Sequence, residues 1–188
     1  MKRVITRTLV REHRLILRML AVLERNALAT GAGAFSDYRF YLDGVDFIRN
    51  YADRFHHAKE EDALFEALVK NGMPRENSPV AAMLMEHDQG RAYVKTMELA
   101  ALLALSGEAG QDAVIAANAL AYVELLRGHI AKEDDILYPL AERLIPDAAR
   151  NAVIAGYDAA EARTADGFDR RYEKIVADYE REGALRAA

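Results

Sequence analysis

The feature that most constrains the fold of this chain is an internal repeat. Residues 56–65 read His-His-Ala-Lys-Glu-Glu-Asp-Ala-Leu-Phe, and residues 129–138 read His-Ile-Ala-Lys-Glu-Asp-Asp-Ile-Leu-Tyr. Six of these ten positions are identical at an offset of 73 residues. Self-similarity at a fixed offset indicates duplicated structural units. We therefore expect the chain to contain two copies of one unit, related by a pseudo-two-fold axis.

Each unit is predicted to be a pair of helices, because apolar residues recur every three or four positions between clusters of helix breakers. The breaks fall at residues 31–36, 71–79 and 106–110 and at Pro146. No alternating strand pattern of useful length occurs in the sequence. The pattern predicts an all-α protein, an antiparallel up-down four-helix bundle with an additional C-terminal helical segment.

The boundaries of these elements can be predicted in part. Ser78 followed by Pro79 resembles a helix N-cap with proline at the first helical position. The bundle is expected to span residues 1–145 and a helical extension, packed on the bundle, residues 146–188. Gly156 and Gly167 interrupt this extension, which is therefore expected as one helix or as two pieces.

Composition excludes several classes of function. The chain contains no cysteine, which rules out disulfides, thiolate nucleophiles and cysteine-ligated zinc or iron–sulfur clusters. The net charge of −5 argues against a nucleic-acid or anionic-membrane surface. No apolar window is long enough for a membrane span, and the first residues carry charges where a signal peptide is apolar. We expect a cytoplasmic protein.

The repeat also places the chemistry. In each unit a histidine precedes a glutamate by four residues, so both side chains project from one helix face. A Glu-His dipeptide on the preceding helix recurs at an offset of 74. The pairs are His56 with Glu60 and His129 with Glu133, and the dipeptides add His13 and His87. A four-helix bundle can bring these four histidines and two glutamates together in its core.

A metal cluster is the simplest way to compensate buried imidazoles and carboxylates. A single His/Glu pair at this spacing is usually a surface interaction, but here all five histidines of the chain fall inside the duplicated pattern. Two glutamates that can bridge suit two metal ions, and nitrogen-rich ligation without thiolates suits iron better than magnesium or calcium. The acids that follow each glutamate are expected mostly on solvated faces: Glu61, Asp62, Asp134 and Asp135. Tyr138, at helical spacing, is expected in the core.

These residues resemble the hemerythrin-like, or HHE cation-binding, family over about residues 5–145. The resemblance implies an up-down four-helix bundle that holds two non-haem Fe ions joined by an oxo or hydroxo bridge, with five histidines and two bridging carboxylates as ligands. Matched by motif, the ligands are His13, His56, Glu60, His87, His129 and Glu133.

Two departures from the family pattern leave alternatives open. Oxygen-carrying hemerythrins use a third-helix His-x-x-x-His pair, and Arg91 stands at the second position here. His57 either supplies the missing imidazole, which we favour, or lies outside the ligand set, as the apolar Ile130 at its repeat position suggests. Carriers also take the last carboxylate five residues after the final histidine, which is Asp134 here. Glu133 is preferred because it matches Glu60 in the repeat.

The resemblance implies a protein that binds or senses O₂, NO or peroxide at an open iron site. The alternative is an enzyme or iron donor in oxidative or nitrosative stress defence, similar to members that consume peroxide or NO or repair iron–sulfur clusters. A third possibility is a mononuclear or zinc site that only staples the bundle, against which the two glutamates argue.

Overall fold

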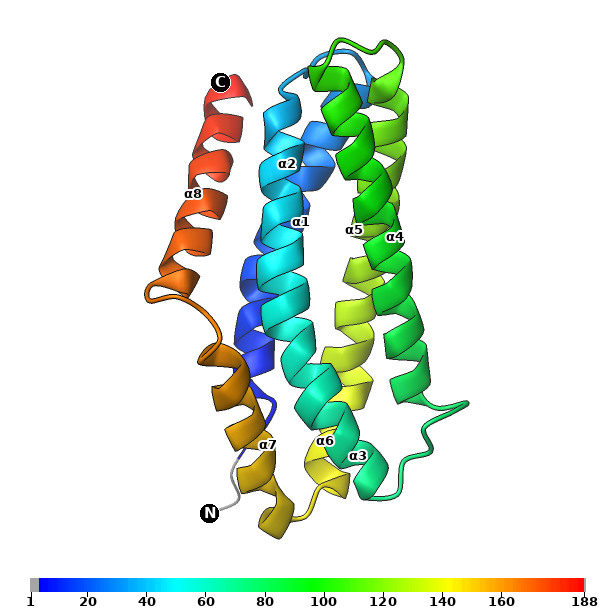
Figure 1. The fold of residues 1–188 in the computed structure, drawn as a ribbon, viewed down its shortest axis with the longest axis vertical. Helices are drawn as coiled ribbons and strands as arrows, with labels where there is room; N and C mark the ends of the chain where they lie inside the picture. Colours follow the sequence, from blue (N-terminus) through cyan, green and yellow to red (C-terminus); the bar gives the residue numbers. More distant parts are fainter. Residues whose placement is uncertain (1–3, 188) are drawn as a thin grey trace.

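The computed structural model describes residues 4–187, and its regular structure is entirely helical (Figure 1). The α-helices are α1 (Arg7–Gly31), α2 (Tyr38–Phe47), α3 (Glu66–Lys70), α4 (Pro79–Leu105), α5 (Gln111–Lys132), α6 (Tyr138–Leu144), α7 (Asp147–Glu161) and α8 (Phe168–Ala187). Three segments are π-helical: η1 (Ile48–His57), η2 (Glu60–Phe65) and η3 (Glu133–Leu137). No strand occurs among residues 4–187, so the all-α prediction is confirmed for the described chain.

The longest helical stretches lie side by side. The segment from α2 to α3 is one continuous stretch that contains η1 and η2, and the segment from α5 to α6 is another that contains η3. α5 packs against both α1 and α4, and α2 packs against α4 and α1, so that these helices enclose a common interior. Consecutive stretches run in opposite directions, joined by short loops at the two ends (Figure 1).

Local sequence signals set the ends of several helices. The Ser78 hydroxyl accepts a hydrogen bond from the backbone N–H of Ala81 at 3.3 Å, which confirms the predicted N-cap of α4. Asp37 caps α2 in the same way by accepting from the N–H of Arg39. Gly110 precedes α5 with a φ of 80°, a left-handed conformation that glycine adopts without strain.

The interior consists of two apolar clusters with a polar layer between them. One cluster surrounds the α1–α2 loop end of the molecule and includes Met19, Phe40 and Met97. The other surrounds the opposite end and includes Leu9, Leu68 and Val153. Each of the four stretches that enclose the interior passes from one cluster to the other, and all five histidines lie at or beside these crossings. The histidines are therefore held in a fixed layer by packed side chains above and below.

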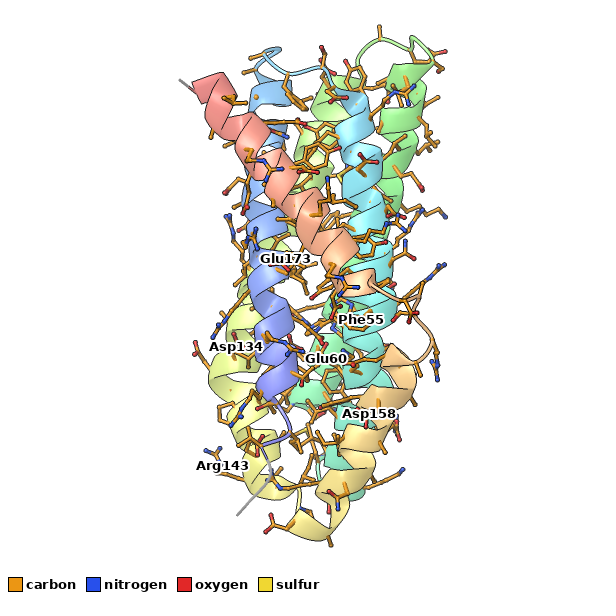
Figure 2. The ribbon with its side chains drawn as sticks, turned by 90° about the vertical axis from the view of Figure 1, so that its left-hand side faces the viewer. Phe55, Glu60, Asp134, Arg143, Asp158 and Glu173 are labelled. Carbon is orange, nitrogen blue, oxygen red and sulfur yellow. The ribbon has the colours of Figure 1, made fainter. Side chains whose placement is uncertain are left out.

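The C-terminal segment lies against the outside of these helices. α7 packs on η2 and α8 lies along α1, where it crosses the face seen in Figure 2. Gly167, with a φ of 77°, lies in the loop between them, whereas Gly156 lies inside α7. A Cβ on Gly156 would lie 2.7 Å from the Cβ of Ala63, so this glycine permits the close approach of α7 to η2.

Among residues 4–187, none of the helices combines the length and the apolar character that a membrane crossing requires.

Candidate metal centre

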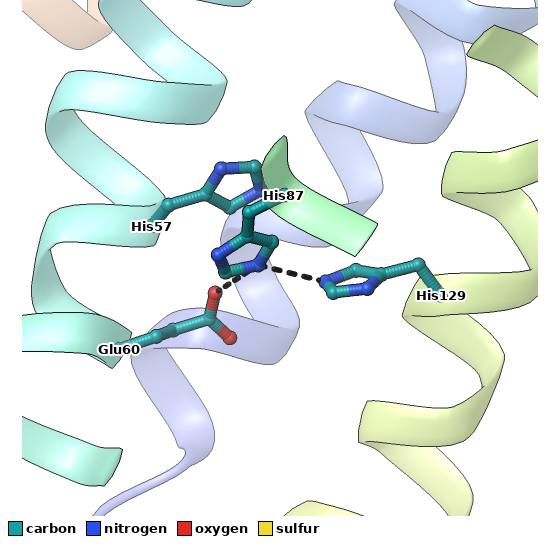
Figure 3. Close-up of side chains that lie close together, drawn as sticks. All are labelled: His57, Glu60, His87 and His129. Carbon is teal, nitrogen blue, oxygen red and sulfur yellow. Dashed lines mark hydrogen bonds and ion pairs between the residues drawn. The ribbon is translucent and has the colours of Figure 1, made fainter. Parts of the chain in front are cut away.

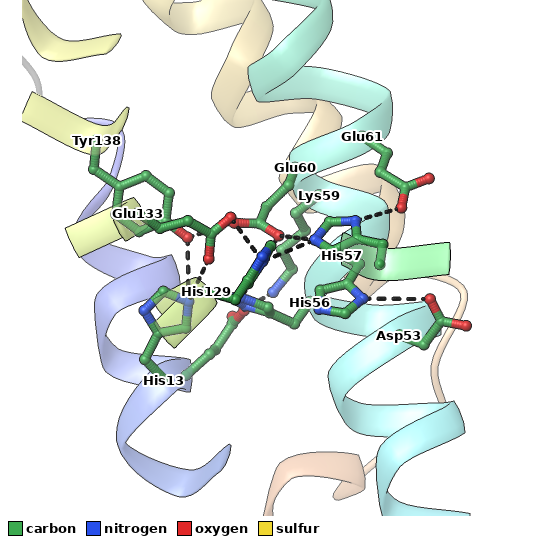
Figure 4. A network of polar contacts seen from close by, with 12 residues as sticks. His13, Asp53, His56, His57, Lys59, Glu60, Glu61, His129, Glu133 and Tyr138 are labelled. Atoms are coloured by element: carbon green, nitrogen blue, oxygen red, sulfur yellow. Dashed lines mark hydrogen bonds and ion pairs between the residues drawn. The ribbon is translucent and has the colours of Figure 1, made fainter. Parts of the chain in front are cut away.

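The seven residues predicted as ligands lie together in the polar layer (Figures 3 and 4). Their potential ligand atoms form two groups, each with all atoms within 4.8 Å of one another, and every member is buried. The three-histidine group consists of His57, Glu60, His87 and His129; the two-histidine group consists of His13, His56, Glu60 and Glu133. Glu60 belongs to both groups.

The side chains of the three-histidine group come from the α2–α3 stretch, from α4 and from α5, and Figure 3 shows them close together. The Nε2 atoms of His87 and His129 are 3.0 Å apart, and the Nε2 of His87 lies 3.7 Å from the Oε2 of Glu60. The ring of His57 stacks on that of His87, with 3.7 Å between their centroids. Imidazole nitrogens and a carboxylate oxygen thus converge on one small volume.

The two-histidine group is centred on the glutamates (Figure 4). The Nε2 of His13 lies 3.3 Å from the Oε2 of Glu133, and the Nε2 of His56 lies 3.8 Å from the Oε2 of Glu60. The other oxygen of Glu133 lies 3.2 Å from the Nε2 of His129, which belongs to the three-histidine group. Both glutamates therefore stand between the two groups, the position that a bridging carboxylate needs.

π-helical turns occur where these residues enter the interior. Glu60 begins η2, Glu133 begins η3, and His56 and His57 end η1. A π-turn has an extra residue compared with an α-turn, and such turns occur frequently at functional sites. They change the direction in which successive side chains leave the helix. At η1 both members of the adjacent pair, His56 and His57, are buried.

Each of the five histidines has a carboxylate at its Nδ1. The pairs are His13 with Asp134 (2.9 Å), His56 with Glu12 (2.9 Å), His57 with Asp53 (3.4 Å), His87 with Glu61 (2.7 Å) and His129 with Glu86 (2.9 Å). A carboxylate at this nitrogen holds the proton there and leaves Nε2 as the free lone pair, the arrangement of metal-bound histidines. Glu61 and Asp134, expected mostly on solvated faces, are partly exposed, and each also binds a buried imidazole.

The outer carboxylates follow the internal repeat. Glu12 accepts from His56 and from the Nζ of Lys59, and Glu86 accepts from His129 and from Lys132. Sequence reasoning missed these roles, although the Glu-His dipeptides and both lysines recur in the two units. The halves differ in burial, because Lys59 is fully buried and also contacts Glu161 of α7, whereas Lys132 is 43% exposed.

Arg91, which stands at the position of the second histidine in oxygen-carrying hemerythrins, forms ion pairs with two carboxylates near the centre. Its guanidinium contacts the Asp53 carboxylate at 2.6 Å and the Glu61 carboxylate at 2.8 Å. These acids hold His57 and His87, so Arg91 ties together the supports of the two stacked rings.

Tyr138 also points into the centre (Figure 4). Its hydroxyl donates to the Oε1 of Glu60 at 2.5 Å and lies 3.3 Å from the Nε2 of His13. The side chain is buried, as expected, but it contacts the polar layer rather than only the core. The internal repeat could have indicated this role, because the equivalent residue in the other unit, Phe65, has no hydroxyl.

The electrostatics of the centre are those of a crowded, buried charge cluster. Burial and the nearby Glu133 carboxylate raise the pKa of Glu60 well above its usual value. Burial also lowers the pKa of His57 to about 4, with the neighbouring His87 adding to the effect. Burial opposes a charge on His13 as well, but Asp134 and Glu133 outweigh it and raise the pKa of His13 to about 9.

Within the described chain, the Oε2 of Glu60 and both side-chain oxygens of Glu133 are buried without a hydrogen-bond partner. Buried acceptors of this kind are uncommon, because each costs free energy that a partner would recover. The donor set and these orphaned oxygens fit a metal cluster between the two groups.

Comparison with known protein families agrees with this geometry. The sequence matches the family described as Hemerythrin HHE cation binding domain over residues 4–141, and the chain belongs to this family. Membership implies the binding of metal ions, and the two buried His/Glu groups could hold them. No curated protein and no solved structure matches the chain.

Proposed function

We propose that this protein is a non-haem di-iron protein that binds or senses O₂, NO or peroxide. The ligands in this proposal are the seven residues predicted from the sequence: His13, His56, His57, Glu60, His87, His129 and Glu133. The proposal includes a hemerythrin-type up-down bundle in residues 1–145 and a separate helical extension in residues 146–188. The cytoplasmic location stays a prediction.

The observation that carries the proposal is the sharing of carboxylates between two histidine groups. Glu60 belongs to both groups, and Glu133 contacts His13 of one group and His129 of the other. Two ions bridged by two carboxylates would satisfy the oxygens that are otherwise orphaned. The seven residues form two groups rather than one, so a single ion cannot bind all of them. This argues against a single metal ion with a purely structural role.

The chemistry of the donors favours iron. Five imidazoles and two carboxylates without a thiolate suit a first-row transition metal, whereas magnesium and calcium prefer oxygen ligands. Structural zinc is usually four-coordinate in a closed site. Asp134 is a weaker candidate for a ligand than Glu133, because its carboxylate is already engaged with the Nδ1 of His13.

The unequal ligand sets give the two positions different roles. An iron pair would supply redox chemistry and a place for a small ligand to bind. His57, His87 and His129 would hold one ion, and His13 and His56 would hold the other, which has one histidine fewer and would leave more room for that ligand. The outer carboxylates keep each Nδ1 protonated and aim each Nε2 at the centre.

Tyr138 supports the enzymatic alternative as a second candidate function. The phenol lies at the two-histidine group, next to His13 and Glu60. Burial and the Glu60 and Glu133 carboxylates raise the pKa of Tyr138 well above its usual value, so its hydroxyl keeps a proton beside the two-histidine group. A reversible O₂ carrier needs an apolar lining there, because a proton donor assists O–O cleavage.

Oxygenation of the reduced protein distinguishes the two functions. The iron-loaded protein is reduced without air, exposed to O₂ and then evacuated while its absorption spectrum is recorded. Spectral changes that reverse on evacuation support binding or sensing. Irreversible change together with steady consumption of added peroxide supports the enzyme, and that rate should fall in Tyr138→Phe. A spectrum that responds to neither O₂, NO nor peroxide contradicts both functions.

A further inference from the structure

The ammonium of Lys59 lies between two carboxylates that come from different helices. Its Nζ lies 2.5 Å from the Oε1 of Glu12 on α1 and 2.8 Å from the Oε1 of Glu161 on α7. It also lies 3.5 Å from the centre of the Phe55 ring. The Lys59 side chain is fully buried, and a buried ammonium is costly unless it is paired. Both carboxylates therefore hold this charge in place.

Glu12 connects this ammonium to the centre. Its other oxygen, Oε2, accepts a hydrogen bond from the Nδ1 of His56 at 2.9 Å. The Glu12 carboxylate thus shares its negative charge between an ammonium and an imidazole. Glu161 binds the same ammonium, so it offsets part of the positive charge that Lys59 exerts on Glu12. An acid on α7 is therefore linked to a proposed metal ligand by three consecutive polar contacts.

The other unit has no counterpart of Glu161. Lys132, the repeat equivalent of Lys59, binds Glu86, and within residues 4–187 no second carboxylate pairs with it. Its side chain is 43% exposed, so water and salt screen its charge. The surroundings of the two groups are therefore unequal, and the extra acid stands on the side of His56, in the two-histidine group.

We propose that Glu161 is a positioning residue that lowers the reduction potential of the iron bound by the two-histidine group. This inference rests on the proposed function. Glu161 acts through Lys59 and Glu12, and it makes the surroundings of that group more negative. Negative surroundings stabilise ferric iron over ferrous iron, because the ferric ion carries one more positive charge. The effect reaches the centre because the intervening charges are buried, where screening by water and salt is weak. α7 supplies none of the proposed ligands, yet its acid sets how easily the centre is reduced.

Glu161→Gln tests the inference on the full-length, iron-loaded protein. The side chain is 44% exposed, and the substitution removes its charge while it keeps its size and an oxygen for Lys59. Midpoint potentials are measured by a spectroelectrochemical titration without air. The affinity for ferric relative to ferrous iron should fall by about 2- to 5-fold, the contribution of one partly exposed ion pair. For a one-electron step this is an upward shift of about 20–40 mV.

Asp158→Asn is the matched control. Asp158 lies one turn earlier on α7, where it is exposed, so the variant removes the same charge from the same helix (Figure 2). It should keep the wild-type potentials. Iron per chain and melting curves are recorded for each protein, and both variants should hold two irons. A wild-type protein without an iron pair contradicts the proposed function and this inference with it. With the pair present, three results overturn this inference alone: unchanged potentials in Glu161→Gln, an equal shift in Asp158→Asn, or loss of iron from Glu161→Gln.

Discussion

Removing the imidazole of His57 should cost the protein one iron and leave the other in place. His57 is one of four residues in the three-histidine group and contributes nothing to the two-histidine group. Loss of an outer-sphere partner alone weakens metal binding by about 10- to 100-fold, so loss of a ligand should exceed about 100-fold at this position. We therefore expect His57→Ala to fall from about two to about one iron per chain, whereas His56→Ala impairs the other group.

A second substitution, at Arg91, should restore iron binding to the His57→Ala variant only if His57 is a metal ligand. Arg91 lies one helical turn after His87 and its side chain reaches Asp53, the carboxylate that supports His57. Arg91→His in the His57→Ala background should place an imidazole beside His87 from α4 and restore the second iron. Iron per chain and the absorption spectrum are measured for both single variants and the double variant. If His57→Ala retains both irons with an unchanged spectrum, His57 is not a ligand and the argument fails.

Three further predictions concern the supports of the centre. Chelation under reducing conditions should lower the melting temperature by about 6 °C or more, because each of the three orphaned carboxylate oxygens costs about 1–3 kcal/mol when buried without a cation and each kcal/mol shifts the melting temperature by about 2–4 °C. Equal melting temperatures for both forms would show that the core does not need the metal. Glu12→Gln and Glu86→Gln should each weaken iron binding about 10- to 100-fold in a chelator competition. Glu12→Gln should also lower the stability of the protein, because its partner Lys59 is fully buried. The control Asp88→Asn changes a side chain that is 79% exposed and should bind iron normally. Gly156→Ala should destabilise the protein by about 1–3 kcal/mol, because the new Cβ would contact Ala63. In the control Gly128→Ala the new Cβ meets nothing within 4 Å, so this variant should be neutral or stabilised by up to about 1 kcal/mol. Similar melting temperatures for both variants would exclude tight packing of α7 on η2.

The helices and the convergence of the site residues could be predicted from the sequence because both depend on local spacing. Breakers such as Ser78-Pro79 mark helix ends, and a histidine four residues before a glutamate faces the same way on any helix. Duplication then makes chance an implausible explanation for the pattern. All seven predicted residues lie together in the structure.

The outer contacts could not be predicted from the same rules, because they depend on how neighbouring helices are rotated and offset. Glu61 follows Glu60 in sequence but binds His87 on another helix. Asp134 makes the corresponding contact to His13, so the two units exchange these supports. The contact of Lys59 with Glu161 joins the centre to a helix outside the repeat, for which periodicity carries no information.

The π-helical turns are a further limit of sequence reasoning. Helical periodicity places His56 and His57 about 100° apart, an angle at which both side chains cannot face the bundle axis squarely. In the structure η1 ends at these residues and both are buried, with His57 stacked on His87. The π-helical turn depends on packing between helices, and no local sequence pattern predicts it.

The central claim, that two irons lie between the histidine groups, is tested most directly by elemental analysis of the protein purified in air, together with its absorption spectrum. The account predicts about two irons per chain and the near-ultraviolet charge-transfer absorption of a bridged iron pair, held by the proposed ligand set of five imidazoles and two carboxylates. One zinc per chain with no such absorption would contradict it.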